Sequence, residues 1–352
     1  MKISLIVPIY NMEDVLHRCI KSLYPVSCMD YEIILVDDGS TDHSGQIIDE
    51  YANEDEHIKV IHKQNGGLSS ARNAGMIVAN GTYISFVDPD DYVEQGYVDK
   101  FYKQCLLGGD IIVGGVKEEI LKNGEQIDFR YNDMNFNSIS SVCAQTYIQQ
   151  SDFLKSCFMH AKFLRKDIID KHNLRFKGIS PTEDTIFLFE YIIHATNITF
   201  LSYQGYHYII YPRQSLSQKL PRYDVSLKIS DYLYERYQTL FNKFANINSE
   251  YKNGLISEYG LGQRIVALID LYSNKRLIYK ERLHLLKRER EEYKKWTKDF
   301  KFRANHKKQG IIFSLIANPV FPLPLVDMAI RWFYFIKKLH DTQINSLFMV
   351  FW

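Results

Sequence analysis

Residues 32–42 read EIILVDDGSTD, an aliphatic run that ends in two aspartates and a glycine turn. The run predicts a buried strand, because β-branched residues favour strands and Asp-Gly is a strong turn signal. In open α/β sheets, ligands bind beyond the carboxyl ends of the strands, where Asp38 would lie. Its carboxylate could accept hydrogen bonds from a nucleobase or a ribose. The alternative is a plain turn in which Thr41 or Asp42 caps a helix.

Apolar runs of similar length lie on both sides of this segment, at residues 3–9, 58–62, 83–88 and 111–116. They alternate with helical patterns, which is typical of βαβ units in an α/β protein. Their near-continuous apolar character indicates burial on both faces of a mostly parallel sheet. Helices are predicted over 15–23, from 41–42 onward, and from 69 to 79.

The bulk composition limits the classes of protein. With 352 residues, the chain is long enough for one large domain with an appendage or for two domains. Its net charge of +1 argues against a strongly basic protein, so we expect no nucleic-acid partner. The five cysteines form no CxxC pair, which favours a reducing cytosol over a disulfide framework or a zinc site. The first apolar run is short and contains Pro8, so it predicts a strand and not a signal peptide.

The character of the chain changes near residues 215–225, where we expect a domain boundary. Before it, residues 117–156 carry polar and turn residues that could be ligand-facing loops or plain insertions. Beyond it the pattern is helical, with a charge-dense stretch at 280–308. The last forty residues are apolar, but prolines and charges interrupt any membrane-spanning helix. This pattern is compatible with an amphipathic segment that lies on a membrane, with contact through 280–352. It is equally compatible with a helix that packs on the rest of the protein.

A second strand end carries three carboxylates, Asp88, Asp90 and Asp91, around a proline. Their mutual repulsion would raise at least one pKa unless a cation lies between them. A hard divalent cation binds oxygen ligands and can bridge diphosphate oxygens. We expect Asp90 to be the direct ligand and Asp88 to meet a ribose or a metal-bound water. An acidic turn without a ligand is the alternative.

A glycine pair, Gly66-Gly67, leads into a helix start made of small residues. Backbone amides and the helix dipole favour anions at such a point. Arg72, one turn into this helix, could pair with a diphosphate. A plain loop and a capped helix would have a similar sequence.

Taken together, these segments resemble the family 2 glycosyltransferases, which have the GT-A nucleotide-binding fold. The resemblance is carried by residues 4–11, 36–42, 67–73 and 88–91, in this order. It implies a Rossmann-like GT-A catalytic domain followed by a mainly α-helical C-terminal region. The implied ranges are 1–220 for the catalytic domain, with a nucleotide-binding half at 1–116 and an acceptor half at 117–220, and 221–352 for the helical region.

The resemblance also implies roles for the residues at the strand ends. The implied nucleotide-binding residues are Pro8, Tyr10, Asp38, Arg72 and Asp88. Asp38 would lie against the base, while Asp88 and Asp90 would form the DxD motif that holds the ribose and Mn²⁺ or Mg²⁺. The family usually uses UDP-sugars, and the implied mechanism is inverting.

The resemblance also implies functional roles for residues in two further segments. Glu183 and Asp184 precede an apolar helical stretch, where acids ordinarily stabilise the first turn. The family carries a Glu-Asp pair here, which implies that Asp184 is the base and that Glu183 supports it or orients the acceptor. His207, in an aromatic strand, and Arg213 resemble elements that close such sites. We expect Arg213 to contact the diphosphate or acceptor, and His207 to approach the metal or to be structural.

The sequence therefore predicts a cytoplasmic enzyme, with peripheral contact to the inner face of the cell membrane as one interpretation. It would transfer a hexosyl or N-acetylhexosaminyl group from a UDP-sugar to a glycan or lipid-linked acceptor in surface polysaccharide synthesis. A nucleotidyltransferase should instead carry a basic glycine loop where residues 8–13 read PIYNME. A non-catalytic sugar-nucleotide-binding or membrane-assembly partner with the same fold is the other alternative. The presence of all four acids of the predicted metal and base sites argues against it.

Overall fold

The structure is a computed structural model. It describes residues 2–24, 30–121, 125–129, 134–136, 158–179, 182–211, 223–243, 264, 268, 272, 277–297, 314–318 and 320–331. Its contacts divide the chain into two compact units. The first comprises Met1–Gln218 and Lys243–Asn246, and the second comprises Lys219–Asn242 and Ile247–Trp352.

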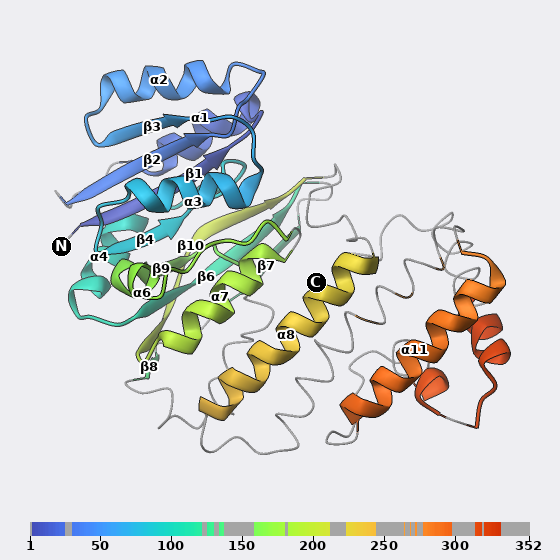
Figure 1. Cartoon of the computed structure of the whole chain (residues 1–352). Helices are drawn as coiled ribbons and strands as arrows, with labels where there is room; N and C mark the ends of the chain where they lie inside the picture. Colours follow the sequence, from blue (N-terminus) through green and yellow to red (C-terminus); the bar gives the residue numbers. More distant parts are fainter. Residues whose placement is uncertain are drawn as a thin grey trace. The chain divides into compact units, whose positions relative to one another are not determined.

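The first unit contains a ten-stranded sheet in the order β3-β2-β1-β4-β9-β6-β10-β5, with β7 beside β6 and β8 beside β10 (Figure 1). Its strands are β1 (Ile3–Ile9), β2 (Tyr31–Asp37), β3 (Ile58–His62), β4 (Tyr83–Phe86), β5 (Tyr92–Val93), β6 (Ile111–Ile120), β7 (Glu125–Phe129), β8 (Met134–Phe136), β9 (Lys162–Arg165) and β10 (Ile198–Ile210).

The sheet is mixed, which corrects the expectation of a mostly parallel one. Strands β1 to β4 pair in parallel, as do β6 and β10, whereas β9 pairs antiparallel with both β4 and β6. The predicted strands at 3–9 and 58–62 are confirmed. The strand at 83–88 ends earlier, at Phe86, because the chain leaves the sheet to form the acidic turn. The strand predicted at 111–116 continues to Ile120, where it still pairs with β10.

Six helices of the described residues accompany this sheet. They are α1 (Glu13–Ser22), α2 (Ser44–Glu54), α3 (Leu68–Val78), α4 (Tyr97–Leu106), α6 (Lys166–Lys171) and α7 (Glu183–His194). The second helix begins at Ser44, later than predicted. Asp42 instead accepts backbone hydrogen bonds from Glu13, at 3.1 Å, and Ser44, at 2.9 Å, so it ties the starts of α1 and α2 together.

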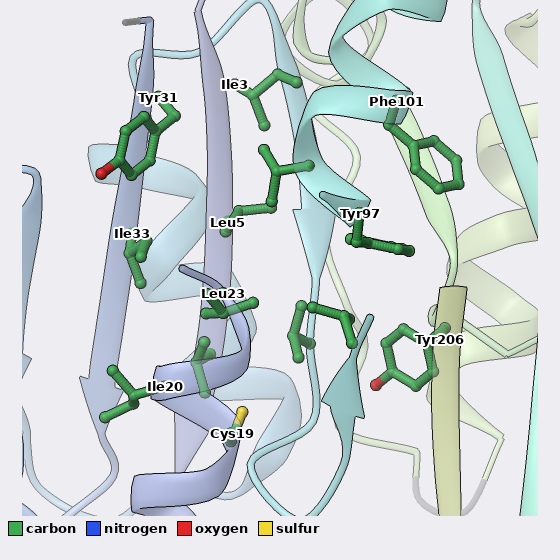
Figure 2. Close-up of a cluster of buried hydrophobic side chains, with 14 of the residues drawn as sticks. Ile3, Leu5, Cys19, Ile20, Leu23, Tyr31, Ile33, Tyr97, Phe101 and Tyr206 are labelled. Carbon is green, nitrogen blue, oxygen red and sulfur yellow. The ribbon is translucent and has the colours of Figure 1, made fainter. Parts of the chain in front are cut away.

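The core of the first unit joins the sheet to α1 and α4. Figure 2 shows Leu5 of β1 and Ile33 of β2 facing Ile20 of α1. In the same cluster, Phe101 of α4 stacks on Phe163 of β9, with ring centroids 4.3 Å apart. Helix α3 packs on β1 and β2, and Gly75 permits this contact because a Cβ there would collide with Ile6.

The second unit is helical in its described part, as the sequence predicts. It contains α8 (Tyr223–Lys243) and α11 (Tyr279–Thr297), with further helical residues at 314–317 and 323–331. Its apolar core contains Leu268, Leu286, Tyr293, Ile316, Val326 and Ile330. Across the described residues of the whole chain, no helix combines the length and apolarity needed to cross a membrane.

Candidate functional site

The carboxyl ends of β1, β2 and β4 meet at one edge of the sheet, because the three strands are parallel and β1 lies between the others. Pro8 is buried opposite Val36, and Tyr10 follows it with 46% of its surface exposed. Asn11 has a φ of 52°, and its side-chain oxygen accepts a 2.8 Å hydrogen bond from the backbone N–H of Thr41. The residues predicted to hold a nucleobase therefore lie beside the loop that follows β2.

Asp38 lies in this loop, with only 3% of its side chain exposed. Its carboxylate pairs with Lys63 and accepts hydrogen bonds from the backbone N–H groups of Gly66, at 3.0 Å, and Gly67, at 2.7 Å. Gly67 precedes α3 with a φ of 83°, a conformation that favours glycine. Asp38 thus fixes the glycine loop at a helix N-terminus, where amides favour anions. From the sequence we predicted that Asp38 contacts a nucleobase, but we did not predict its hydrogen bonds to the glycine loop.

Arg72 lies on α3 and is only 1% exposed, so its guanidinium is buried. It lies over the rings of Phe86, at 5.9 Å, and Phe176, at 5.3 Å. A buried cation is stable only when carboxylates or equivalent partners compensate its charge. The charged end of Arg72 points to carboxylates of the chain itself, and its predicted contact with a nucleotide stays a prediction.

Those carboxylates come from two distant segments. Arg72 Nη2 donates to Asp88 Oδ1, at the end of β4, over 2.9 Å. Arg72 Nη1 donates to Asp184, at the start of α7 and 112 positions away in the sequence, and lies 3.8 Å from Glu183 Oε1. The structure therefore brings together Asp88, Glu183 and Asp184, which the sequence predicted to share one site.

The Glu-Asp pair at the start of α7 has strongly shifted acidity. Burial, together with the charge of Asp184, raises the pKa of Glu183 to about 7. Burial raises the pKa of Asp184 as well, while the neighbouring Arg72 opposes that rise. Asp184 also accepts a 3.4 Å hydrogen bond from the backbone N–H of Met159. No described residue hydrogen-bonds the buried Oε2 of Glu183. A carboxyl group that titrates near neutrality, as Glu183 does, can exchange protons with a substrate.

The acidic turn follows β4 and is held by contacts to its backbone and side chains. Burial and the charge of Asp88 raise the pKa of Asp90 to about 6. The backbone oxygen of Asp90 accepts hydrogen bonds from Arg18, at 2.5 Å, and from the Tyr211 hydroxyl, at 3.2 Å. Asp91 is fully buried. It accepts hydrogen bonds of 2.8 Å from the Tyr206 hydroxyl and from the backbone N–H of Ile209.

Three side chains at this turn could hold a metal ion. Asp88, Asp91 and His160 each offer one ligand atom, and these atoms lie within 4.8 Å of one another. Carboxylate oxygens with an imidazole nitrogen are a suitable donor set for a divalent cation such as Mn²⁺. Asp90, the predicted direct ligand, is not among the three.

His207 lies in a different cluster. Its Nδ1 is 2.5 Å from Glu119 Oε1 and its Nε2 is 3.4 Å from Glu94 Oε1. Its ring stacks on Tyr92, with centroids 4.3 Å apart. The structure thus places His207 beside Glu119 of β6 and Glu94, which follows β5, and its approach to the metal stays a prediction. Arg213 lies outside the described residues.

Sequence reasoning missed Arg18 and His160. Arg18 belongs to α1, whose apolar face was evident but whose polar face gave no reason to single out one arginine. His160 follows a segment without clear periodicity and precedes β9. Neither residue belongs to a motif, and only the tertiary fold brings them to the acidic turn.

Comparison with known proteins agrees with this geometry. Glycosyl transferase family 2 matches residues 4–171 of the chain. The glycosyltransferase GlyG of Streptococcus pneumoniae serotype 4 is 30% identical over 233 residues, which are 64% of this chain and 75% of GlyG. The putative glycosyltransferase EpsH of Bacillus subtilis is 32% identical over 237 residues, 64% of each protein. The chain spans only 33% of EpsJ of B. subtilis and 16% of GlyA of S. pneumoniae.

A solved structure shares the fold across nearly the whole chain. The crystal structure of S. aureus TarS 1–349 in complex with UDP-GlcNAc has a TM-score of 0.67 at 18% identity. The match covers 98% of this chain and 93% of that chain. The predicted fold class, a GT-A-type domain followed by a helical region, is confirmed by this likeness.

Proposed function

Because the chain belongs to glycosyl transferase family 2, we propose that it transfers a sugar from a UDP-sugar to a hydroxyl group of a glycan or lipid-linked acceptor. The sugar would be a hexose or an N-acetylhexosamine, and the product would belong to a surface polysaccharide. The observation that carries the proposal is the buried bridge from Asp88 through Arg72 to Asp184. It joins Asp88, a carboxylate of the predicted DxD motif, to Asp184, the candidate base.

Residues 1–220 form the catalytic domain of this proposal, with the donor bound by 1–116 and the acceptor by 117–220. Tyr10 is exposed beside the loop that holds Asp38, so both suit a nucleobase and its ribose. The glycine loop at α3 supplies backbone amides for an anion. The TarS complex with UDP-GlcNAc, which has the same fold, supports a UDP-sugar donor.

The reaction is a single in-line displacement at the anomeric carbon. A bond forms from the acceptor oxygen to this carbon as the bond to the diphosphate breaks on the opposite face, so the configuration inverts. Asp184 takes the proton of the acceptor hydroxyl, and Glu183 orients the acceptor or shares that proton. Arg72 acts as a positioning residue, because its buried charge fixes the Asp184 carboxylate relative to Asp88.

The cation of this proposal, Mn²⁺ or Mg²⁺, binds at the acidic turn. Asp88 is the ligand that both the motif and the geometry support, and Asp90 is the second carboxylate of the motif. A bound divalent cation would neutralise charge on the nucleoside diphosphate. The contacts of Arg18 and Tyr211 to the backbone oxygen of Asp90 hold the turn in place. Arg213 remains a candidate for diphosphate or acceptor contact.

The enzyme of this proposal is cytoplasmic, and its helical C-terminal region, residues 221–352, contacts the membrane surface through 280–352. Exposed apolar side chains in that unit support the contact: Val320 is 80% exposed and Met328 is 62% exposed. Deletion of 311–352 should abolish flotation with vesicles of anionic lipid while sparing UDP binding. Unchanged flotation of the truncated chain would remove the membrane proposal and leave the transferase proposal intact.

A screen of UDP- and GDP-sugars tests the activity itself. The purified chain should hydrolyse or bind at least one UDP-sugar in a manner that depends on Mn²⁺, as measured by UDP release and by calorimetry. If the chain bound neither UDP nor any UDP-sugar, the proposed donor would be wrong. Binding without transfer to any acceptor, and without slow hydrolysis, would favour a non-catalytic sugar-nucleotide-binding protein.

A further inference from the structure

His160 lies at the acidic turn with its imidazole directed toward Asp88 and Asp91, although no sequence motif includes it. We propose that His160 supplies a nitrogen ligand to the cation held by Asp88 and Asp91, and that this ligand makes the site prefer Mn²⁺ to Mg²⁺. The inference rests on the proposed function, since it identifies the ligand set and the metal of the same site.

The His160 ring is held in place by aromatic neighbours. It stacks on Phe158, Tyr206 and Tyr208, and each of the three centroid distances is 5.2 Å. The following residue, Ala161, accepts a 2.8 Å backbone hydrogen bond from Gly114 of β6. These contacts fix both the backbone and the plane of the ring, so the imidazole reaches the turn with little conformational freedom.

His160 is also a largely buried polar side chain, and its ring contacts among the described residues are aromatic stacking. Only 9% of its surface is exposed, and no described residue hydrogen-bonds either ring nitrogen. Buried polar groups are nearly always paired, because an unpaired one loses its hydration without compensation. His207, a buried histidine of β10, has its Nδ1 2.5 Å from Glu119 Oε1. A cation between His160 and the carboxylates would supply such a partner.

The two carboxylates are oriented as metal ligands usually are, by contacts from a second layer of residues. Arg72 holds Asp88 through Oδ1. The Tyr206 hydroxyl and the backbone N–H of Ile209 hold the two oxygens of Asp91. Opposite ligands of a six-coordinate ion lie about 4.2 Å apart, twice a bond of ~2.1 Å. The ligand atoms of Asp88, Asp91 and His160 all lie within 4.8 Å of one another, so one ion could contact all three.

The nitrogen ligand determines the preference for the metal. Mg²⁺ favours oxygen ligands and gives up its water reluctantly, whereas transition-metal ions accept imidazole readily. A set of two carboxylates and one imidazole therefore favours Mn²⁺. A site made of Asp88 and Asp90 alone would contain only oxygen ligands and would have no such preference.

Pulsed electron paramagnetic resonance of Mn²⁺ on the full-length chain tests this ligand directly. We expect echo modulation from a coordinated ¹⁴N nucleus in the wild type, both with and without UDP, and a shift to ¹⁵N frequencies after labelling with ¹⁵N-histidine. The modulation should vanish in His160→Gln and persist in His207→Gln, a matched control in which a buried histidine is changed. The Kd for Mn²⁺ should rise by ~10-fold or more in His160→Gln, a loss of the size seen when metal-site residues are removed.

The outcomes separate the inference from the proposed function. Bound Mn²⁺ without nitrogen modulation, or with modulation that survives in His160→Gln, would overturn the inference while leaving Mn²⁺-dependent transfer in place. Equal affinities of the wild type for Mn²⁺ and Mg²⁺ would remove the predicted selectivity. Failure of the wild type to bind Mn²⁺ at all would overturn the inference and the metal dependence of the proposed function together. If His160→Gln does not fold, as judged by circular dichroism, His160→Asn and the labelled wild type decide the question.

Discussion

Arg72 Nη2 donates a hydrogen bond of 2.9 Å to Asp88 Oδ1, and this contact joins a buried guanidinium to a half-buried carboxylate. It links α3, whose glycine loop is held by Asp38, to the acidic turn after β4. Through its other nitrogen, the same guanidinium reaches Asp184 on α7. Arg72 thus connects the acidic turn after β4 to Asp184, the candidate base.

Arg72→Met should destabilise the protein strongly. The substitution leaves Asp88, Glu183 and Asp184 without their buried counter-charge, which costs about 3–5 kcal/mol for a broken buried pair. The loss should be larger at pH 8 than at pH 5, because the raised pKa values of Glu183 and Asp184 let these groups take up protons at the lower pH. Urea unfolding monitored by circular dichroism measures both values.

Arg165→Met is the control for that experiment. Arg165 also pairs with two aspartates, Asp110 and Asp167, but 37% of its side chain is exposed. Ion pairs in contact with solvent contribute only ~1 kcal/mol or less. Equal losses in the two variants, or a loss from Arg72→Met that does not change with pH, would show that the buried bridge does not carry the charge balance described above.

Glu183→Gln should stabilise the protein relative to the wild type as the pH rises. Glu183 has a pKa raised from 4.5 to about 7, so between these values the folded state binds more protons than the unfolded state. The free energy of unfolding of the wild type therefore falls as the pH rises through this window. Gln carries no proton to lose, so the stability difference should grow by roughly 2–3 kcal/mol between pH 5 and pH 8.

The exposed residue Glu50 of α2 provides the control, because Glu50→Gln should give a pH profile parallel to that of the wild type. Chemical unfolding at several pH values yields all three curves. A Glu183→Gln curve that also runs parallel to the wild type would mean that Glu183 is not held in its neutral form by its surroundings.

Asp38→Ala should weaken UDP binding by ~10-fold or more, since about 1–3 kcal/mol follows from each buried donor left unpaired. The variant deprives Lys63, Gly66 and Gly67 of their shared acceptor, so the glycine loop loses its anchor. Calorimetric titration with UDP and Mn²⁺ measures the change. Asp49→Ala, on the exposed face of α2, should bind UDP like the wild type. An unchanged affinity in Asp38→Ala would separate this loop from the nucleotide site.

Asp90→Asn should weaken metal-dependent nucleotide binding. The Asp90 carboxyl has a pKa raised to about 6 by burial and by Asp88, so its ionised form is costly without a nearby cation. Removal of its charge should raise the Kd for UDP in the presence of Mn²⁺ and leave the weaker, metal-free binding unchanged. Calorimetry with and without a chelator distinguishes the two. If Asp90→Asn weakened UDP binding equally with and without the metal, Asp90 would only shape the turn.

The sequence predicted those parts of the site that lie at the ends of regular elements. Strand ends such as Asp38 and Asp88 could be located because apolar runs end abruptly in carboxylates. The meeting of Asp88 with Asp184 was predictable only through the resemblance, since 96 positions separate them and local pattern carries no information on such contacts. The short strand β5 and the antiparallel strand β9 were missed for the same reason, because tertiary pairing defines them.

The burial of Arg72 shows the limit of reading charge from sequence. The sequence suggested that Arg72, near a glycine loop, could pair with a diphosphate. The structure surrounds this side chain with Phe86, Phe176 and three carboxylates. Burial depends on which side chains the fold brings from α7 and β4. His160 and Arg18 could be identified only from the structure, because the fold brings them to the acidic turn from distant segments.

Asp184→Asn tests the central claim most directly, because Asn keeps the size of the side chain but cannot accept a proton. Transfer to an acceptor and binding of the UDP-sugar should be measured on the same preparation, with Mn²⁺ present. We expect the Kd of the donor to stay within ~3-fold of the wild type while the transfer rate falls by at least ~100-fold, the scale of general-base catalysis. Equal transfer rates in Asp184→Asn and the wild type would contradict the assignment of the base.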